Sequence, residues 1–132
     1  MMRPDFTHED HAIDAWLDAH HGELIELAQN LVRIPTENTP PTGGELEGQR
    51  FVQAQLEQLG AAVDTFTPDE VQELNQHPAY HPLINGEPRD FTNRPNVVGR
   101  FPGAGSGRSA ILSTHMDTVP AGDPSQWREG TP

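Results

Sequence analysis

A histidine and an aspartate, His115 and Asp117, stand two residues apart directly after a short apolar run. A neutral imidazole is the side chain that most often binds a metal ion in proteins. Its second ring nitrogen needs a hydrogen-bond acceptor, commonly a carboxylate, which fixes the orientation of the ring. In an extended chain, residues two positions apart point to the same side. The spacing therefore predicts one metal ligand, His115, and one orienting carboxylate, Asp117.

A His-x-Asp sequence alone is also common in solvated loops, where the aspartate caps a turn. The apolar run at residues 110–112 favours the metal site, because it is typical of a strand buried on both faces of a parallel or mixed sheet. Ligand chemistry in open α/β sheets gathers just beyond the carboxyl ends of strands. Pro120 follows the pair and ends regular pairing, since proline has no N–H to donate.

The sequence S-T-H-M-D-T-V-P, residues 113–120, resembles the first metal-site motif of a metallohydrolase family, the acetylornithine deacetylase/succinyl-diaminopimelate desuccinylase family. That family includes aminoacylases and carboxypeptidases. The resemblance extends, in the family's order, over L-V-R-I-P-T-E-N-T-P-P (31–41), Q-L-E-Q-L-G (55–60), R-P-N-V-V-G-R-F (94–101) and Gly122, Asp123 and Trp127. It implies an α/β fold, the N-terminal portion of a catalytic domain. The implied order is helix, helix, strand, insertion, strand, strand, with a mixed sheet flanked by helices.

The same resemblance implies an activity, the hydrolysis of an amide in a small N-acylated amino acid or dipeptide-like substrate. Members of the family use two zinc ions, or cobalt or manganese in some cases, which activate a water molecule and polarise the carbonyl. His115 matches a metal ligand of the family, and Asp117 matches the catalytic carboxylate that orients it. The family's bridging aspartate, Glu-Glu pair, further carboxylate and second histidine follow this motif, and the 132 residues contain no counterpart of them.

We therefore expect residues 1–132 to be the N-terminal segment of a single catalytic domain, truncated before the remaining ligands. The lid and dimerisation domain, through which family members often form homodimers, is expected to be missing. Catalytic zinc sites normally use three protein ligands, so we expect the chain alone to be inactive. An alternative remains open: the chain is a non-catalytic fragment or a small acidic module that binds a partner through an unfinished sheet. The sequence leaves undecided whether the chain is an enzyme.

Composition restricts the possible partners and compartment. The formal net charge is −12, and all eight basic residues are arginines, which argues against binding to nucleic acid or to anionic membranes. The absence of cysteine excludes disulfides and thiolate metal sites. No apolar run is long enough for a signal peptide or a membrane span, so we expect a cytoplasmic protein. A hydrophobic fraction of 33% with 13 prolines and 12 glycines predicts a loop-rich chain.

Periodicity predicts the elements that position the pair. Apolar residues recur with helical spacing from Asp10 to Val32, with Gly22 as a weak point and His20 and His21 on the surface. A capping-box pattern from Thr42 to Glu45 predicts the start of a second helix, which ends at Gly60. The expected strands are residues 61–66, 96–101 and 110–112, and the glycine-rich segment 102–107 is expected to join the last two as a hairpin.

Residues 67–95 are expected to form a loop-rich insertion, because they contain several prolines and acidic residues. A short helix near residues 69–76 and a position over the mouth of the active site are further expectations. His77 and His81 have the spacing of a metal pair on a helix. A proline directly follows each of them, which makes a continuous helix improbable and argues against a zinc site there.

Overall fold

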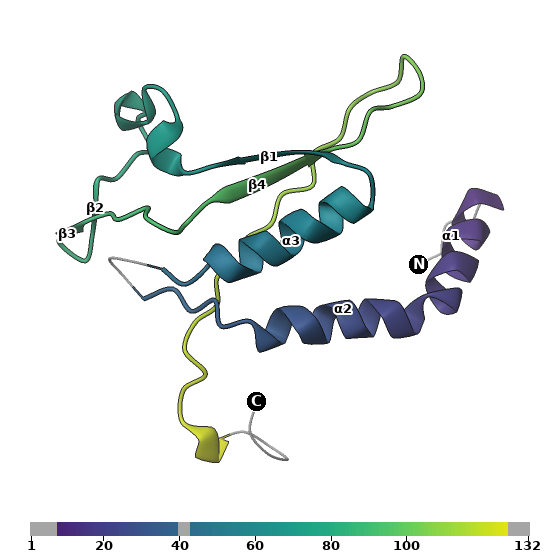
Figure 1. Cartoon of the computed structure of the whole chain (residues 1–132), viewed down its shortest axis with the longest axis horizontal. Coiled ribbons are helices and arrows are strands. Elements are labelled where there is room, and N and C mark those ends of the chain that lie inside the picture. The colour runs from purple at the N-terminus through teal and green to yellow at the C-terminus, as the bar shows by residue number, and fades with distance from the viewer. Residues whose placement is uncertain (1–7, 40–42, 127–132) are drawn as a thin grey trace, which may run out of the picture. The chain divides into compact units, whose positions relative to one another are not determined.

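A computed structural model describes residues 8–39 and 43–126, which contain three α-helices, two pairs of β-strands and short 3-10 turns (Figure 1). Its mixed α/β class agrees with the prediction. The expectations for Thr42 and Trp127 lie outside the described residues. The chain divides into two compact units, Met1–Ile34 and Pro35–Pro132.

The first unit contains two helices, α1 (His8–Ala19) and α2 (His21–Arg33), so the prediction of one continuous helix was wrong. The interruption lies at His20, whose φ and ψ are −111° and 12°. The His20 ring stacks on the Trp16 ring with centroids 4.1 Å apart, and its Nδ1 lies 2.7 Å from the Trp16 carbonyl oxygen. The Trp16 carbonyl, which also accepts the His20 backbone N–H at 3.0 Å, is thus contacted by both the backbone and the ring of His20 at the end of α1.

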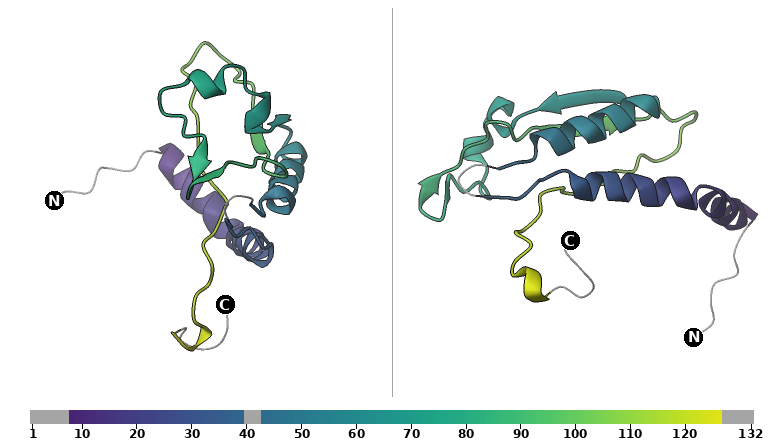
Figure 2. Two further views of the ribbon diagram at one scale, coloured as in Figure 1. Left: turned by 90° about the vertical axis from the view of Figure 1, so that its left-hand side faces the viewer. Right: turned by 60° about the horizontal axis from the view of Figure 1, so that its bottom comes forward.

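The second unit is built on α3 (Leu46–Gln58) and the strands β1 (Ala62–Phe66) and β4 (Asn96–Arg100). The two strands are antiparallel, with Ala62 opposite Arg100 and Phe66 opposite Asn96. Helix α3 runs along this strand pair (Figures 1 and 2). Leu56 of α3 packs on Gly99, where a Cβ atom would lie only 3.0 Å from the leucine methyl groups. Both strands and the end of α3 before Gly60, at a φ of 85°, were predicted correctly.

The start of α3 differs from the predicted capping box. Glu45 is the N-cap residue rather than a residue of the first helical turn, and its side chain forms no capping hydrogen bond. Its carboxylate is instead bonded to Arg94, 49 positions along the chain. A long-range ion pair has therefore taken the side chain that the local pattern assigned to the helix.

The segment 67–95 contains two 3-10 turns, η1 (Pro68–Glu70) and η2 (Leu74–Gln76), in place of one short helix. It also contains a small hairpin of β2 (Leu83–Ile84) and β3 (Glu87–Pro88). The residues between these strands, Asn85 and Gly86, both have positive φ angles, 53° and 86°. Such a pair is what a tight two-residue hairpin turn requires.

The strand expected at residues 110–112 is not formed, and the predicted hairpin over 102–107 is therefore wrong as well. The sheet beside α3 has two antiparallel strands, where three in a mixed sheet were expected. Ile111 and Leu112 are 91% and 99% exposed. A short apolar run forms a strand when other layers cover both of its faces, and no such cover lies over this one among the described residues.

The described residues contain no fully buried hydrophobic side chain. Helix α3 covers one face of the β1–β4 pair, while Val98 on β4 remains 49% exposed. The buried polar residues are Thr36 and Glu45, which are 4% and 6% exposed. Burial of apolar surface is normally the main source of stability, yet among the described residues the buried side chains are polar.

Candidate metal site

The two residues singled out by their spacing are in direct contact. His115 Nδ1 lies 2.8 Å from Asp117 Oδ1, so both side chains point to the same side, as the spacing predicts. Since an ionised carboxylate only accepts hydrogen bonds, Nδ1 is the donor, and in the neutral ring the other nitrogen, Nε2, carries the lone pair. The His115 side chain is 83% exposed and that of Asp117 30% exposed. Asp117 therefore orients the imidazole through Nδ1, while most of the ring remains accessible to solvent.

Asp117 is itself held by a third residue. Asn38 donates from Nδ2 to Asp117 Oδ2 at 2.9 Å, so each carboxylate oxygen has a separate partner. The Asn38 hydrogen bond, with a smaller contribution from His115, keeps the pKa of Asp117 below its ordinary value of 3.8, although partial burial acts in the opposite direction. Asp117 is thus ionised at neutral pH and serves as an acceptor for His115.

Backbone pairing brings these side chains together from distant parts of the sequence. The segment 36–38 lies beside 116–118 through a parallel bridge between Glu37 and Thr118. Thr118 donates its backbone N–H to the Thr36 carbonyl, and Asn38 donates to the Thr118 carbonyl, both at 2.9 Å. The buried Thr36 hydroxyl donates to the Met116 carbonyl at 2.9 Å. In this parallel register Thr36 lies opposite Asp117, and the Asn38 side chain, two residues further along the same strand face, reaches Asp117 diagonally.

Helix α3 supports the same segment through Gly48. A Cβ atom at this position would lie 2.6 Å from Met116 Cε and 2.8 Å from Thr36 Cγ2, closer than van der Waals contact permits. A glycine is therefore needed here for space rather than for conformation. It lets Met116, the residue next to His115, and Thr36 lie against α3.

A pocket of about 200 Å³ opens in front of the pair, and an ion pair lines it together with His115 and Asp117. Arg94 donates from Nε at 3.1 Å and from Nη2 at 2.7 Å to the same oxygen, Oε1, of Glu45. Only 17% of the Arg94 side chain and 8% of the Glu45 side chain are exposed. The second oxygen, Glu45 Oε2, is buried without a hydrogen-bond partner.

The donor set decides what this site can hold. Within residues 8–39 and 43–126, no three His, Cys, Asp or Glu side chains are grouped to bind a metal ion. A catalytic zinc ion normally has three protein ligands. His115 with Asp117 suits one oriented ligand of such a site, but these residues do not hold a metal by themselves. His77 and His81 offer no substitute, because they lie outside any helix and His77 Nδ1 lies 3.2 Å from the Ala79 amide nitrogen.

Four residues that shape the site were not predicted from the sequence. Thr36 and Asn38 hold the segment that carries His115 through hydrogen bonds. Glu45 and Arg94 form the buried ion pair beside it. A weak signal exists for the first two, which alternate in an extended segment with the same period of two as His115 and Asp117. The ion pair has no local signal, since its partners are far apart in sequence.

No family model, curated protein or solved structure matches the chain. The described helices include none that is long and apolar enough to cross a membrane.

Proposed function

We propose that this chain belongs to a metal-dependent hydrolase of the acetylornithine deacetylase/succinyl-diaminopimelate desuccinylase type, acting on the amide of an N-acylated amino acid or peptide-like substrate. The observation that carries the proposal is the 2.8 Å contact from His115 Nδ1 to Asp117, with the rest of the imidazole exposed. This is the arrangement that a ligand histidine with its orienting carboxylate has in metalloenzymes. The ordered sequence resemblance over most of the chain is the second support.

Each residue then has a defined role. His115 offers Nε2 as a ligand, Asp117 keeps Nδ1 protonated and the ring oriented, and Asn38 holds Asp117 in place. Zinc bound at such a centre would make water a nucleophile near neutral pH and polarise the scissile carbonyl. The open pocket in front of His115 gives a substrate access to this side of the imidazole.

The remaining ligands would come from polypeptide outside the described residues, because these contain no group of three His, Cys, Asp or Glu side chains that could hold a metal ion. The exposure of Ile111 and Leu112 supports this part of the proposal. These two apolar side chains directly precede the site, and covering them with another layer of protein would be favourable. The covering layer is also the natural source of further ligands next to His115.

The test is native purification of the tagged protein, with everything that stays bound to it, from the cells that produce it. We expect the purified material to contain zinc, cobalt or manganese and to release the acyl group from N-acyl amino acids. His115→Ala should remove most of the bound metal and most of the hydrolysis, because it deletes a direct ligand. Asp117→Ala should reduce turnover more than metal content, since Asp117 acts through His115. His21→Ala, a substitution on α2 of the other unit, is the matched control and should change neither.

The outcome that contradicts the proposal is wild-type material without metal and without hydrolysis, or metal and hydrolysis that are unchanged in His115→Ala. The alternative function, an acidic module that binds a protein partner, would then be favoured. The exposed Ile111 and Leu112 would in that case be its contact surface.

A further inference from the structure

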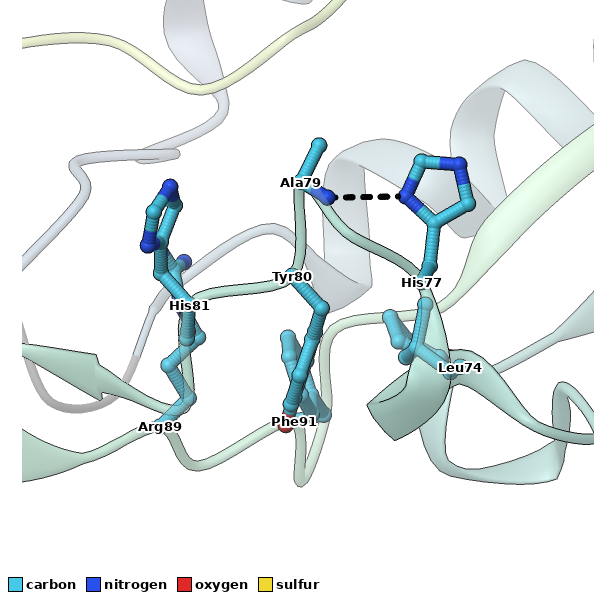
Figure 3. A pocket seen from close by; sticks show the side chains of 8 residues that line it. Leu74, His77, Ala79, Tyr80, His81, Arg89 and Phe91 are labelled. Carbon is cyan, nitrogen blue, oxygen red and sulfur yellow. Dashed lines mark hydrogen bonds between the residues drawn. The ribbon is translucent and has the colours of Figure 1, made fainter.

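A second pocket, of about 260 Å³, lies within the segment 67–95 (Figure 3). Leu74, Tyr80 and Phe91 provide apolar and aromatic walls, and Arg89 and His81 provide polar ones. In Figure 3 the Tyr80 ring points towards Phe91, and Arg89 lies next to His81. A cavity of about 150 Å³ is enough to take up a benzene molecule, so a phenyl group fits here.

Arg89 is fixed in position but not neutralised. Its Nε donates to the His81 carbonyl oxygen at 2.7 Å, and its backbone N–H donates to the Pro82 carbonyl at 3.0 Å. Among the described residues no carboxylate pairs with it, whereas Arg94 is paired with Glu45. The two terminal nitrogens of a guanidinium held in this way can accept a carboxylate in the two-pronged geometry that arginine favours.

The second pocket adjoins the one in front of His115. Arg89, Phe91 and Pro68 line both. A ligand whose carboxylate is bound at Arg89 therefore has an apolar cavity on one side and the His115 pocket on the other. The chain's net charge of −12 disfavours anions in general, so the binding of a carboxylate at this junction depends on the Arg89 guanidinium.

We propose that this pocket binds a small carboxylate that bears an apolar ring or branched chain, with the carboxylate on Arg89 and the apolar group between Tyr80 and Phe91. The role of this pocket as a substrate subsite next to His115 rests on the proposed function. Its ability to bind the carboxylate does not, because none of the residues that line the pocket is a metal ligand. The pocket would then select amide substrates that carry both a carboxylate and an apolar side chain.

The test compares two probes of the same shape, 3-phenylpropionate and its uncharged amide, titrated into the whole chain in the presence of EDTA and followed by amide NMR. We expect the acid to bind at least about tenfold more tightly than the amide, because only the acid forms charge-assisted hydrogen bonds with arginine. The shifted signals should lie in the segment 67–95. Arg89→Gln should remove the preference for the acid, and Phe91→Ala should weaken the binding of both probes.

Arg100→Gln, on β4 outside both pockets, is the control with the same change of charge and should bind like the wild type. The acid-to-amide comparison needs no variant, so the inference is testable even if Arg89→Gln unfolds the segment. Equal binding of acid and amide by the wild type, or an unchanged preference in a folded Arg89→Gln variant, would overturn it. Binding without any hydrolysis in the native material would refute the proposed function alone. Hydrolysis without binding of the acid would refute this inference alone.

Discussion

Arg94→Met tests whether the buried ion pair with Glu45 holds the site together. The substitution keeps most of the aliphatic stem but removes the guanidinium, so Glu45 is left charged in a position where only 8% of its side chain is exposed. Removing one partner of a buried pair costs about 3–5 kcal/mol, mostly because the other charge stays buried and unpaired. Since Arg94 is still 17% exposed, we expect the lower end, about 3 kcal/mol.

Arg50→Met provides a matched control. Arg50 is also paired, at 2.6 Å with Glu47, but the two side chains are 62% and 68% exposed. Such surface pairs contribute about 0–1 kcal/mol, and pairs of this kind on one helix about 0.3–0.5 kcal/mol. Both variants lose one arginine and one unit of charge, so the comparison isolates burial.

The measurement is native-state amide exchange in β4, the strand that begins two residues after Arg94. A loss of about 3 kcal/mol should speed exchange there by about a hundredfold, against about twofold for Arg50→Met. Adding Glu45→Gln to Arg94→Met should restore part of the protection, because the unpaired charge is then gone. Equal effects of the two arginine variants, or a double variant no better protected than Arg94→Met, would refute the reasoning.

Two further substitutions test the contacts of His115 and Asp117. Asn38→Ala should raise the pKa of Asp117 towards its ordinary value of 3.8, as followed by carboxyl NMR, because the largest cause of its lowering is removed. A lowered folded-state pKa contributes stability above the unfolded value of about 3.9 and loses it as the pH falls through the folded value, so the stability difference between wild type and variant should shrink below about pH 4. An unchanged pKa would contradict the assignment of its cause. Gly48→Val should displace Met116 and abolish protection of the Thr118 amide, whereas Gly22→Val, at a helical glycine with free space around it, should leave that amide unchanged. Protection that survives Gly48→Val would show that the packing is not needed.

The elements predicted correctly are those whose cause is local. Helix α3 ends before Gly60 because a residue with a positive φ is needed there, and the apolar spacing of β1 and β4 was enough to find both strands. The contact of His115 with Asp117 also follows from local geometry, the period of two in extended chain.

Several of the errors have causes that are not local. Residues 110–112 are apolar like a buried strand, but a strand needs partners that this part of the chain does not provide. Glu45 fits a capping box, but Arg94 binds its carboxylate instead. Two errors are local: the break between α1 and α2 at His20, and the hairpin turn at Asn85-Gly86, whose local signal is strong although its flanking strands have two residues each.

The distribution of burial bears on what keeps the segment around His115 ordered. Thr36 and Glu45 are buried, whereas Ile111 and Leu112 are exposed. The described residues therefore bury polar side chains and lack the apolar burial that normally stabilises a fold. A hydrogen bond exchanged with water contributes only about 1 kcal/mol, whereas a fully buried leucine or isoleucine contributes about 1.5–3 kcal/mol. Covering Ile111 and Leu112 would therefore stabilise the segment that leads into His115 more than its own hydrogen bonds do. If the proposed function is correct, the polypeptide that covers these residues both completes the ligand set and fixes the histidine in place.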